Sequence, residues 1–293
     1  NRYCLDRVRH STLEFAMNDK KSIDSLRDFL SEQDSVVVLT GAGVSTASGI
    51  PDYRDRNGEW KQREPMQFGE FKGSDQARKR YWARSYVGWA RFSGAQPNAA
   101  HRALADLESS GKVELLVTQN VDGLHRQAGS RNVIDLHGRL AKVRCIDCDA
   151  TQERECFQDA LSRANPDWHA DVLRYQADGD AVLAANGHEQ FSVPGCPACG
   201  GTVKPDVVMF GESVPQSRVQ RALAAIDRAC ALFIVGSSLM VYSGFRFARH
   251  AAASGVPIAI VNRGRTRADN LATLKVDDDC GTVLPLMLDP QTA

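Results

Sequence analysis

The sequence predicts an α/β protein, in which a doubly wound parallel sheet is interrupted by a small inserted module. Two observations support this fold class. Four runs of β-branched and aliphatic residues each end in small or amide-bearing residues, and helix-like stretches lie between them, as expected for parallel strands. The strand pattern fades in one internal region, where two Cys-x-x-Cys pairs occur.

The four runs are predicted to be buried strands of one sheet. In a doubly wound sheet their carboxyl ends meet along one edge, where a dinucleotide can lie, so the domain is expected to be Rossmann-like. Helices are expected between the strands, for example over 98–109 and 218–228. The runs are DSVVVLTGAGVS (34–45), VELLVTQN (113–120), ALFIVGSS (231–238) and PIAIVNRG (257–264).

The chain is predicted to have three parts. Residues 1–33 form an N-terminal extension with a helix, 34–140 together with 205–293 form the Rossmann-like domain, and 141–204 form a small metal-binding module. The boundaries of the module rest on the loss of strand signals and on the position of the cysteines.

The composition is that of an ordinary globular chain of 293 residues, with 43% hydrophobic and 25% charged residues. The 36 basic and 36 acidic residues cancel, so no global basic field attracts nucleic acid or an anionic membrane surface. No apolar run of about 18 residues occurs, and the amino terminus has no secretory apolar core. We therefore expect no membrane association and no direct binding to nucleic acid.

Four of the eight cysteines carry the strongest local chemical signal. Cys145 pairs with Cys148, and Cys196 pairs with Cys199. Two such turns brought together supply the closed four-sulfur shell of one structural Zn²⁺, which favours a reducing compartment. The gap between the pairs exceeds the usual spacing of roughly 15–20 residues, so two unrelated redox or buried pairs remain the alternative. Ordinary thiol behaviour is expected of Cys4, Cys156 and Cys230.

The stretch GAGVSTASGIPDYR, residues 41–54, predicts a turn at the end of the first strand. Gly41 and Gly43 allow the backbone to pass close to a diphosphate, and the small residues after them are predicted to open a helix. A plain strand-to-helix turn explains a bare Gly-x-Gly equally well. Arg54 is a candidate phosphate donor, although most arginines on a surface are simply solvated.

Six motifs in this order resemble those of sirtuins, which are NAD-dependent protein lysine deacylases. They are GAGVSTASGIPDYR, TQNVDGLH, DLHG, the two Cys-x-x-Cys pairs, KPDVVMFGE and VGSSL, and the resemblance covers roughly residues 34–286. RYWARSYVGW and VYSGFRFA look closest to the class II branch, with its mitochondrial and bacterial members. The resemblance implies a cytoplasmic location in a bacterium, or the mitochondrial matrix in a eukaryote. The chain departs from the common pattern at Ala47, Tyr53, Ser237 and Ser243, where many members carry Glu, Phe, Thr and Pro.

The resemblance implies that NAD is a co-substrate from which nicotinamide leaves, and that the acyl group of an acylated lysine ends on ADP-ribose. Asn120 and Asp122 match the residues that hold the carboxamide and the sugar hydroxyls, and Gln119 matches a ribose contact. His137 matches the general base, which takes a proton through the ribose hydroxyls. Without the family, a single histidine after an apolar run is more typical of a structural residue. His125 lies in a predicted helix and is expected to pack or to cap.

The resemblance also implies further contacts, for which strand-end turns and a buried thiol are the structural alternatives. The implied NAD-binding set comprises Gly41, Ala42, Gly43, Tyr53, Arg54, Gln119, Asn120, Asp122, Gly236, Ser237, Ser238, Asn262, Arg263, Gly264 and Cys280. The segment that matches the family's peptide-pairing strand comprises Val208, Met209, Phe210, Gly211 and Glu212.

The expectation for the acyl preference rests on Tyr81 and Arg84. Their spacing places them on one face of a helix, and it resembles the pair with which desuccinylating sirtuins grip an acidic acyl chain. The alternative is an aromatic packing face with solvated arginines, and acetyl or longer neutral chains as substrates.

Three other functions fit parts of the sequence. A nicotinamide oxidoreductase usually carries a different glycine motif, a mono-ADP-ribosyltransferase would share nicotinamide cleavage, and a zinc-ribbon module would bind without catalysis. A monomer is expected, with acylated lysine side chains of proteins as partners. The acyl group, the target proteins and the role of residues 1–33 are left open.

Overall fold

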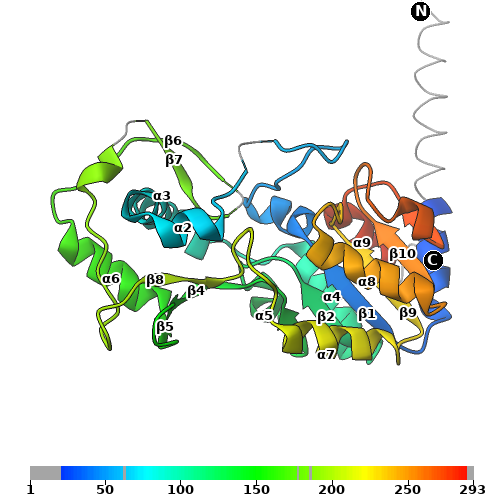
Figure 1. Cartoon of the computed structure of the whole chain (residues 1–293). Coiled ribbons are helices and arrows are strands. Elements are labelled where there is room, and N and C mark those ends of the chain that lie inside the picture. Colours follow the sequence, from blue (N-terminus) through cyan, green and yellow to red (C-terminus); the bar gives the residue numbers. More distant parts are fainter. Residues whose placement is uncertain (1–20, 62–63, 177, 185–186, 289–293) are drawn as a thin grey trace, which may run out of the picture.

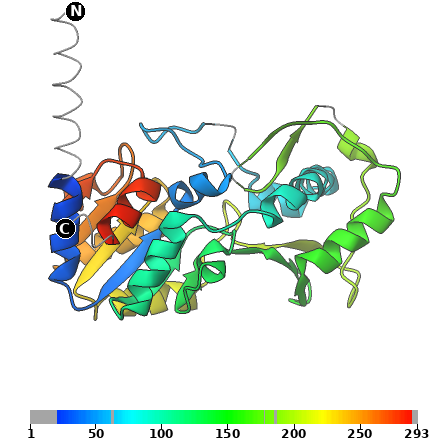
Figure 2. The ribbon, with the colours of Figure 1, turned by 180° about the vertical axis from the view of Figure 1, so that it is seen from behind.

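The structure is a computed structural model that describes residues 21–61, 64–176, 178–184 and 187–288. A larger α/β lobe and a smaller lobe lie side by side (Figures 1 and 2). Residues 21–31 are helical, whereas most of the predicted N-terminal extension, including Cys4, lies outside the described residues.

The larger lobe is built on a six-stranded parallel sheet, which confirms the predicted fold class. Its strands are β1 (Val36–Thr40), β2 (Val113–Thr118), β3 (Val133–Asp135), β9 (Ala231–Val235), β10 (Ile258–Val261) and β11 (Leu274–Val276). Their order is β11-β10-β9-β1-β2-β3, so the chain extends to one side of β1 first and returns on its other side later. The four predicted runs are β1, β2, β9 and β10. The three-residue strands β3 and β11 were not predicted, because so short a run carries no periodicity.

Helices cover both faces of this sheet (Figure 1). One face packs against the helix at residues 21–31, α4 (Ala99–Ser109) and α9 (Cys280–Leu288). The other packs against α7 (Gln216–Ile226) and α8 (Tyr242–Ala253). The predicted helices are confirmed as α4 and α7. Short helices occur at η1 (Ala42–Ser48), α5 (Leu124–Gln127) and η3 (Asp269–Leu271).

The smaller lobe combines a three-stranded antiparallel sheet, a hairpin and helices. Its elements are α2 (Phe68–Gly73), α3 (Asp75–Ser93), β4 (Gly138–Cys145), β5 (Thr151–Glu153), α6 (Arg154–Ala164), β6 (Val172–Tyr175), β7 (Ala181–Leu183), η2 (Gly187–Gln190) and β8 (Val203–Val207). The sheet has the order β5-β4-β8, and β6 pairs with β7.

The predicted module, residues 141–204, is too narrow for this lobe. Helices α2 and α3 were assigned to the Rossmann-like domain, but Phe71 and Trp82 share one buried core with Val143 and Phe157. Trp82 also donates from Nε1 to the carbonyl of Val203 at 3.1 Å. Aromatic side chains of α3 therefore bind it to the cysteine-containing sheet, a contact between segments far apart in sequence.

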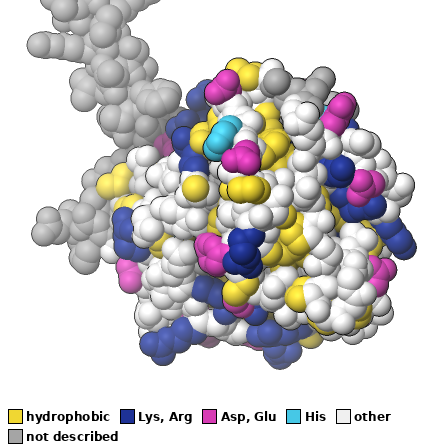
Figure 3. All heavy atoms as spheres, turned by 90° about the vertical axis from the view of Figure 1, so that its left-hand side faces the viewer, with side chains coloured by type: hydrophobic (Ala, Val, Ile, Leu, Met, Phe, Trp, Pro, Cys, Tyr) yellow, Lys and Arg dark blue, Asp and Glu magenta, His cyan; other side chains and the backbone are white. Residues whose placement is uncertain are grey.

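The surface agrees with the balanced charge of the chain. Figure 3 shows the free end of the smaller lobe, where acidic and basic side chains are interspersed over the visible face. Across the part of the chain that the structure describes, no helix combines the length and the apolar character that a membrane span requires.

Candidate active site

A cavity of about 550 Å³ lies at the carboxyl ends of the parallel strands. Gly41 follows β1, Gln119 follows β2, Gly236 follows β9 and Asn262 follows β10, and all four line it. The chain changes sides of the sheet at β1, so this is the topological switch point at which doubly wound sheets bind ligands. The smaller lobe contributes the opposite wall, with residues such as Leu140.

Most of the predicted site residues line this cavity. Those from the NAD-binding and catalytic set are Gly41, Ala42, Gly43, Tyr53, Arg54, Gln119, Asn120, Asp122, His137, Gly236, Ser237, Ser238, Asn262 and Arg263. Those from the predicted substrate set are Tyr81, Val208, Met209, Phe210, Gly211 and Glu212.

Gly264 and Cys280 do not line the cavity, and their role as NAD contacts stays a prediction. Cys280 is buried in the sheet core, with its Sγ 3.5 Å from the carbonyl oxygen of Gly43. Gly264 has a φ of 86° and lies against the backbone of Arg56. Both residues support the cavity wall from behind.

Gly41 and Gly43 allow the loop after β1 to pack closely against the loop after β9. A Cβ on Gly41 would lie 2.7 Å from the Cβ of Ser237, and a Cβ on Gly43 would lie 2.9 Å from the carbonyl oxygen of Gly236. The amide of Gly43 also donates to that carbonyl at 2.9 Å. The turn continues as the short 3₁₀ helix η1 (Ala42–Ser48), where the small residues were predicted to open a helix. The loops after β1 and β9 therefore form one continuous wall.

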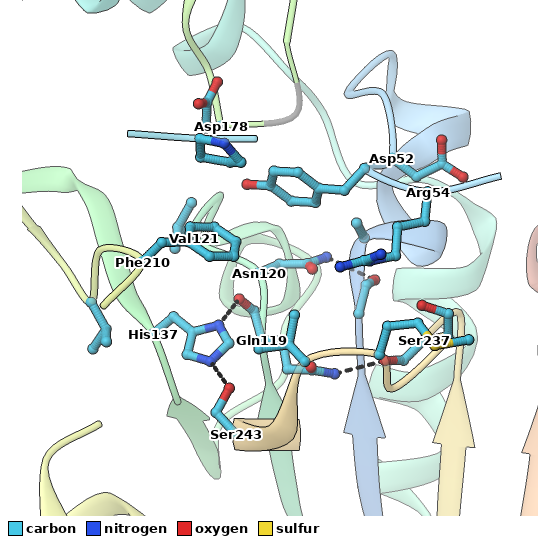
Figure 4. A pocket seen from close by; sticks show the side chains of 18 of the residues that line it. Asp52, Arg54, Gln119, Asn120, Val121, His137, Asp178, Phe210, Ser237 and Ser243 are labelled. Carbon is cyan, nitrogen blue, oxygen red and sulfur yellow. Dashed lines mark hydrogen bonds between the residues drawn. The ribbon is translucent and has the colours of Figure 1, made fainter. Parts of the chain in front are cut away.

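His137 lies between β3 and β4 and has both ring nitrogens occupied. Nδ1 is 2.9 Å from the carbonyl oxygen of Gln119, and Nε2 is 2.8 Å from Oγ of Ser243 (Figure 4). A carbonyl only accepts, so Nδ1 carries the proton and the lone pair of the neutral ring is on Nε2. Burial, together with the positive charges of Arg218 and Arg246, lowers the pKa of His137 to about 4, although the hydrogen bond to Gln119 opposes this shift. The ring is therefore neutral at neutral pH and able to accept a proton at Nε2.

Asn120 and Asp122 are held by a buried serine that the sequence analysis missed. Ser45 donates from Oγ to Oδ2 of Asp122 at 2.7 Å and accepts from Nδ2 of Asn120 at 3.0 Å. The amide of Leu124 donates to Oδ1 of Asp122 at 2.9 Å. Burial raises the pKa of Asp122, while these hydrogen bonds lower it. An amide and a carboxylate are thus presented together in fixed orientations beside the cavity.

His125 packs, as predicted. It is 1% exposed on α5, its Nε2 is 2.9 Å from Oγ1 of Thr40, and its ring centroid lies 4.8 Å from that of His101. Burial lowers the pKa of His101 to about 4 and that of His125 well below its usual value. The two neutral rings form a buried layer beneath Ser45, and neither lines the cavity.

Arg54 and Tyr53 are held in a loop that folds back on itself. The Arg54 guanidinium lies 3.9 Å from the centroid of Trp60, donates to the carbonyl of Gly58 at 2.7 Å and reaches into the cavity (Figure 4). The ring of Trp60 also contacts Tyr53 edge to face, with centroids 6.2 Å apart. Arg54 is thereby presented as a donor for an anionic ligand.

Arg84 does not face the cavity, and its predicted role as a grip for acidic acyl chains is corrected. Its Nη2 lies 3.4 Å from Oδ2 of the buried Asp180 and donates to Gln176, and its Nε donates to Ala181 at 3.2 Å. The guanidinium is therefore occupied by the β6–β7 turn. Tyr81 does line the cavity, but as part of an aromatic cluster with Phe71.

The β6–β7 turn instead adds an acidic group that the sequence analysis missed. Asp178 lines the cavity on the side of the smaller lobe, away from Ser243 (Figure 4). Burial raises the pKa of Asp178, and the nearby Arg84 lowers it. Burial raises the pKa of Tyr53 and of Tyr81, and the negative charges of Asp178 and Asp180 raise both further. This wall therefore presents a carboxyl where a guanidinium was predicted.

The segment after β8 is clamped at the cavity. Oε2 of Glu212 accepts from the amide of Met209 at 2.8 Å and from Nζ of Lys204 at 3.0 Å. The amide of Val208 donates to the carbonyl of His137 at 2.8 Å, so this segment runs beside His137. Phe210 also lines the cavity (Figure 4).

The four predicted cysteines meet and fit one zinc ion. Their sulfur atoms all lie within 4.8 Å of one another, with 3.6 Å between Cys145 and Cys199 and 3.8 Å between Cys148 and Cys196. Tetrahedral Zn–S bonds of about 2.3 Å require sulfur separations of about 3.8 Å. Each knuckle closes with a left-handed residue, Asp149 at φ 59° and Gly200 at φ 74°. The other described thiols, Cys156, Cys230 and Cys280, lie outside this cluster.

Four cavity-forming residues were missed because their signals depend on the fold. Ser45 lies inside the quoted glycine motif but was treated only as a small residue, and Asp178 lies in a polar, irregular stretch. Ser243 was noted only as a departure from the family pattern, and Arg246 carried no signal of its own.

Comparisons with known proteins give a consistent result. The Sir2 family model matches residues 41–243. An NAD-dependent protein deacetylase of Bordetella bronchiseptica is 56% identical over 262 residues, covering 89% of this chain and 96% of the relative. One of Xanthomonas axonopodis pv. citri is 55% identical over 266 residues, covering 91% of each.

Solved structures agree with the sequence relatives. A Sir2 protein with a p53 peptide and NAD⁺ has a TM-score of 0.71 and 32% identity, with 89% of this chain and 94% of that chain covered. A Sir2 protein bound to an acetylated peptide has a TM-score of 0.70 and 30% identity, with 89% and 95% covered. With His137, the amide–carboxylate pair and the four-cysteine cluster in place, the chain belongs to the Sir2 family, the sirtuins.

Proposed function

We propose that this chain removes neutral acyl groups from lysine side chains of proteins, with NAD as the co-substrate. The observation that carries the proposal is the convergence of His137, Asn120 and Asp122 on one cavity at the switch point of the sheet. The relatives named NAD-dependent protein deacetylase support the same activity.

The cavity suits NAD by its volume and by the chemistry of its donors. A cavity of about 550 Å³ lies in the range of ligand pockets. Arg54 and Arg263 supply guanidinium donors for phosphates, and the loop of Ser237 and Ser238 supplies hydroxyls. Asn120 and Asp122 would hold the carboxamide and the sugar near it. When NAD is bound, its anomeric carbon is the electrophile that receives the acyl oxygen as nicotinamide leaves.

The chain's own contribution to the chemistry is proton transfer and orientation. His137 accepts a proton at Nε2, because its Nδ1 proton is committed to Gln119. Asp122 and Asn120 recognise rather than attack, since Ser45 holds both side chains and the amide of Leu124 also holds Asp122. The segment from Met209 to Glu212 is the proposed pairing edge for the substrate peptide.

The preference for neutral acyl groups follows from the wall formed by the smaller lobe. Arg84 is paired with Asp180 and outside the cavity, while Asp178 lines it beside Tyr81. An acidic acyl chain that reached this wall would meet a carboxyl and no free guanidinium from Arg84. Acetyl or longer neutral chains meet the phenol and aromatic surfaces instead.

The experiment that tests the function is incubation with NAD and a panel of acyl-lysine peptides, followed by mass spectrometry. Acetyl and neutral longer chains should be lost together with release of nicotinamide and formation of acyl-ADP-ribose. Transfer of ADP-ribose to protein in place of acyl loss would establish the ADP-ribosyltransferase alternative. Reduced cofactor would indicate an oxidoreductase. No change in NAD would contradict all three enzymes.

Two further proposals concern the molecule in its environment. We propose a structural zinc in a reducing compartment such as the bacterial cytoplasm, because the four-sulfur site requires thiolates and the relatives named above are bacterial. We also propose a monomer, which light scattering during size-exclusion chromatography tests directly. Nucleic acid is not proposed as a partner, in keeping with the zero net charge.

A further inference from the structure

We propose that Ser243 is a positioning residue for the general base, and that this chain depends on its hydroxyl where many sirtuins carry proline. The inference rests on the proposed function of His137. It concerns how the imidazole is kept in its reactive orientation before substrates bind.

The hydrogen-bond geometry dictates the direction of each bond to His137. Because the carbonyl of Gln119 only accepts, Nδ1 must be the donor at 2.9 Å. Neutral Nε2 then has only a lone pair, so the hydroxyl of Ser243 donates to it at 2.8 Å. Ser243 therefore holds the nitrogen that accepts the catalytic proton, and the ring is fixed at two opposite corners (Figure 4).

The position of Ser243 is itself fixed by its neighbour. Ser243 lies in the first turn of α8 (Tyr242–Ala253), followed by Gly244. A Cβ added to Gly244 would clash with the side-chain amide of Gln119, so only glycine allows this approach. The side chain of Gln119 is in turn held by Ser237 at 2.8 Å. Ser243, His137, Gln119 and Gly244 thus form a closed ring of contacts.

Proline at this position would offer no donor to Nε2. With alanine, the ring would keep its bond to Gln119 but could rotate about that contact, and Nε2 would lose its fixed direction. Proton transfer depends steeply on such orientation, whereas the contacts that bind NAD and peptide lie elsewhere in the cavity. Loss of the Ser243 hydroxyl should therefore slow the proton transfer to His137.

Two reactions of the same enzyme separate that step from earlier ones. Attack of the acyl oxygen on the anomeric carbon transfers no proton, so the departure of nicotinamide does not require His137. Exchange of labelled nicotinamide into NAD therefore reports binding and cleavage alone. Deacylation also requires the base. Ser243→Ala should lower kcat for deacylation about 5- to 20-fold, with KM for peptide and NAD within about 2-fold and exchange near the parent level. Ser243→Thr keeps the hydroxyl and should retain most of kcat.

The control for a general effect of losing a serine is Ser254→Ala, at the exposed end of the same helix. A second readout needs no NAD: ¹⁵N NMR of the imidazole in the free protein. The parent should show Nδ1 protonated and a hydrogen-bonded lone pair at Nε2. In Ser243→Ala, the Nε2 signal should move toward that of a free lone pair, while Nδ1 stays protonated.

Parent-like deacylation and an unchanged Nε2 signal in Ser243→Ala would overturn the proposal. Equal losses of exchange and deacylation would also overturn it, since they indicate a structural defect. A parent protein with no nicotinamide exchange on any acyl peptide would instead refute the proposed function itself.

Discussion

Substitution of Arg84 tests whether this side chain binds an acidic acyl chain or only stabilises the β6–β7 turn. In the structure, Arg84 pairs with Asp180, which is 2% exposed and whose Oδ1 has no hydrogen-bond partner among the described residues. Arg84→Met would leave that carboxyl without its cation. Removing one member of a fully buried pair costs about 3–5 kcal/mol. Because Arg84 is 24% exposed, we expect a loss of about 2–3 kcal/mol.

A loss of this size should lower Tm by about 4–12 °C for a chain of this length. The pKa of Asp180 is raised by burial first and then by Asp178, and Arg84 lowers it, so removing Arg84 raises it further. A carboxyl with a raised folded-state pKa destabilises the fold increasingly as pH rises from the unfolded-state pKa to the folded-state pKa, and protonation removes the penalty as pH falls. The deficit of Arg84→Met relative to the parent should therefore be larger at pH 8 than at pH 5.

Thermal unfolding at both pH values measures this, together with kcat/KM on succinyl and acetyl peptides. The double variant Arg84→Met/Asp180→Asn is the matched control, because it removes the uncompensated charge and should recover part of the lost stability. The ratio of succinyl to acetyl activity should not change. A variant with the parent Tm and a selective loss of succinyl activity would refute this reasoning and restore the acyl-grip interpretation.

Three other predictions follow from the site. His137→Ala should abolish deacylation while preserving the fold and nicotinamide exchange, which circular dichroism and labelled nicotinamide check. The pKa of His137, lowered to about 4, implies that the acid limb of kcat/KM for the free enzyme lies well below 6.5, and a pH–rate profile from 4 to 8 measures it. Metal analysis should find one zinc per chain, and Cys196→Ala should give insoluble or unfolded protein, because folding of the smaller lobe and metal binding are coupled. Less than about half an equivalent would count against the site.

A prediction for acyl choice completes the set. Asp178→Asn should raise the ratio of kcat/KM for succinyl over acetyl peptides about 3- to 10-fold, because a like charge is removed from the cavity wall. The exposed Asp167→Asn is the control for a loss of one negative charge elsewhere in the same lobe. An unchanged ratio would mean that the acyl chain does not reach Asp178.

The parts of the fold that the sequence predicted are those with a local signal. Each run that became β1, β2, β9 or β10 is apolar and ends in small or amide residues, so both the strand and its functional end were readable. Helix spacing correctly placed Tyr81 and Arg84 together on α3. It could not reveal that Asp180 lies opposite, because that contact comes from a turn far along the chain. The extent of the smaller lobe was missed for the same reason, since α3 joins it through Trp82 and Val203.

The contacts of Gln119 explain why the orientation of His137 is better tested by substituting Ser243 on α8. Its backbone carbonyl holds Nδ1 of His137, while its side chain donates to Thr40 at 3.1 Å and to Ser237 at 2.8 Å. Ser237 belongs to the loop that packs on Gly41, so a change at Gln119 would disturb both the base and the wall proposed to bind NAD. Ser243 contacts His137 at the opposite corner of the ring, and among the described residues its hydroxyl bonds to His137 rather than to that wall. Substitution at Ser243 therefore separates the orientation of the base from the binding of the co-substrate, which substitution at Gln119 cannot do.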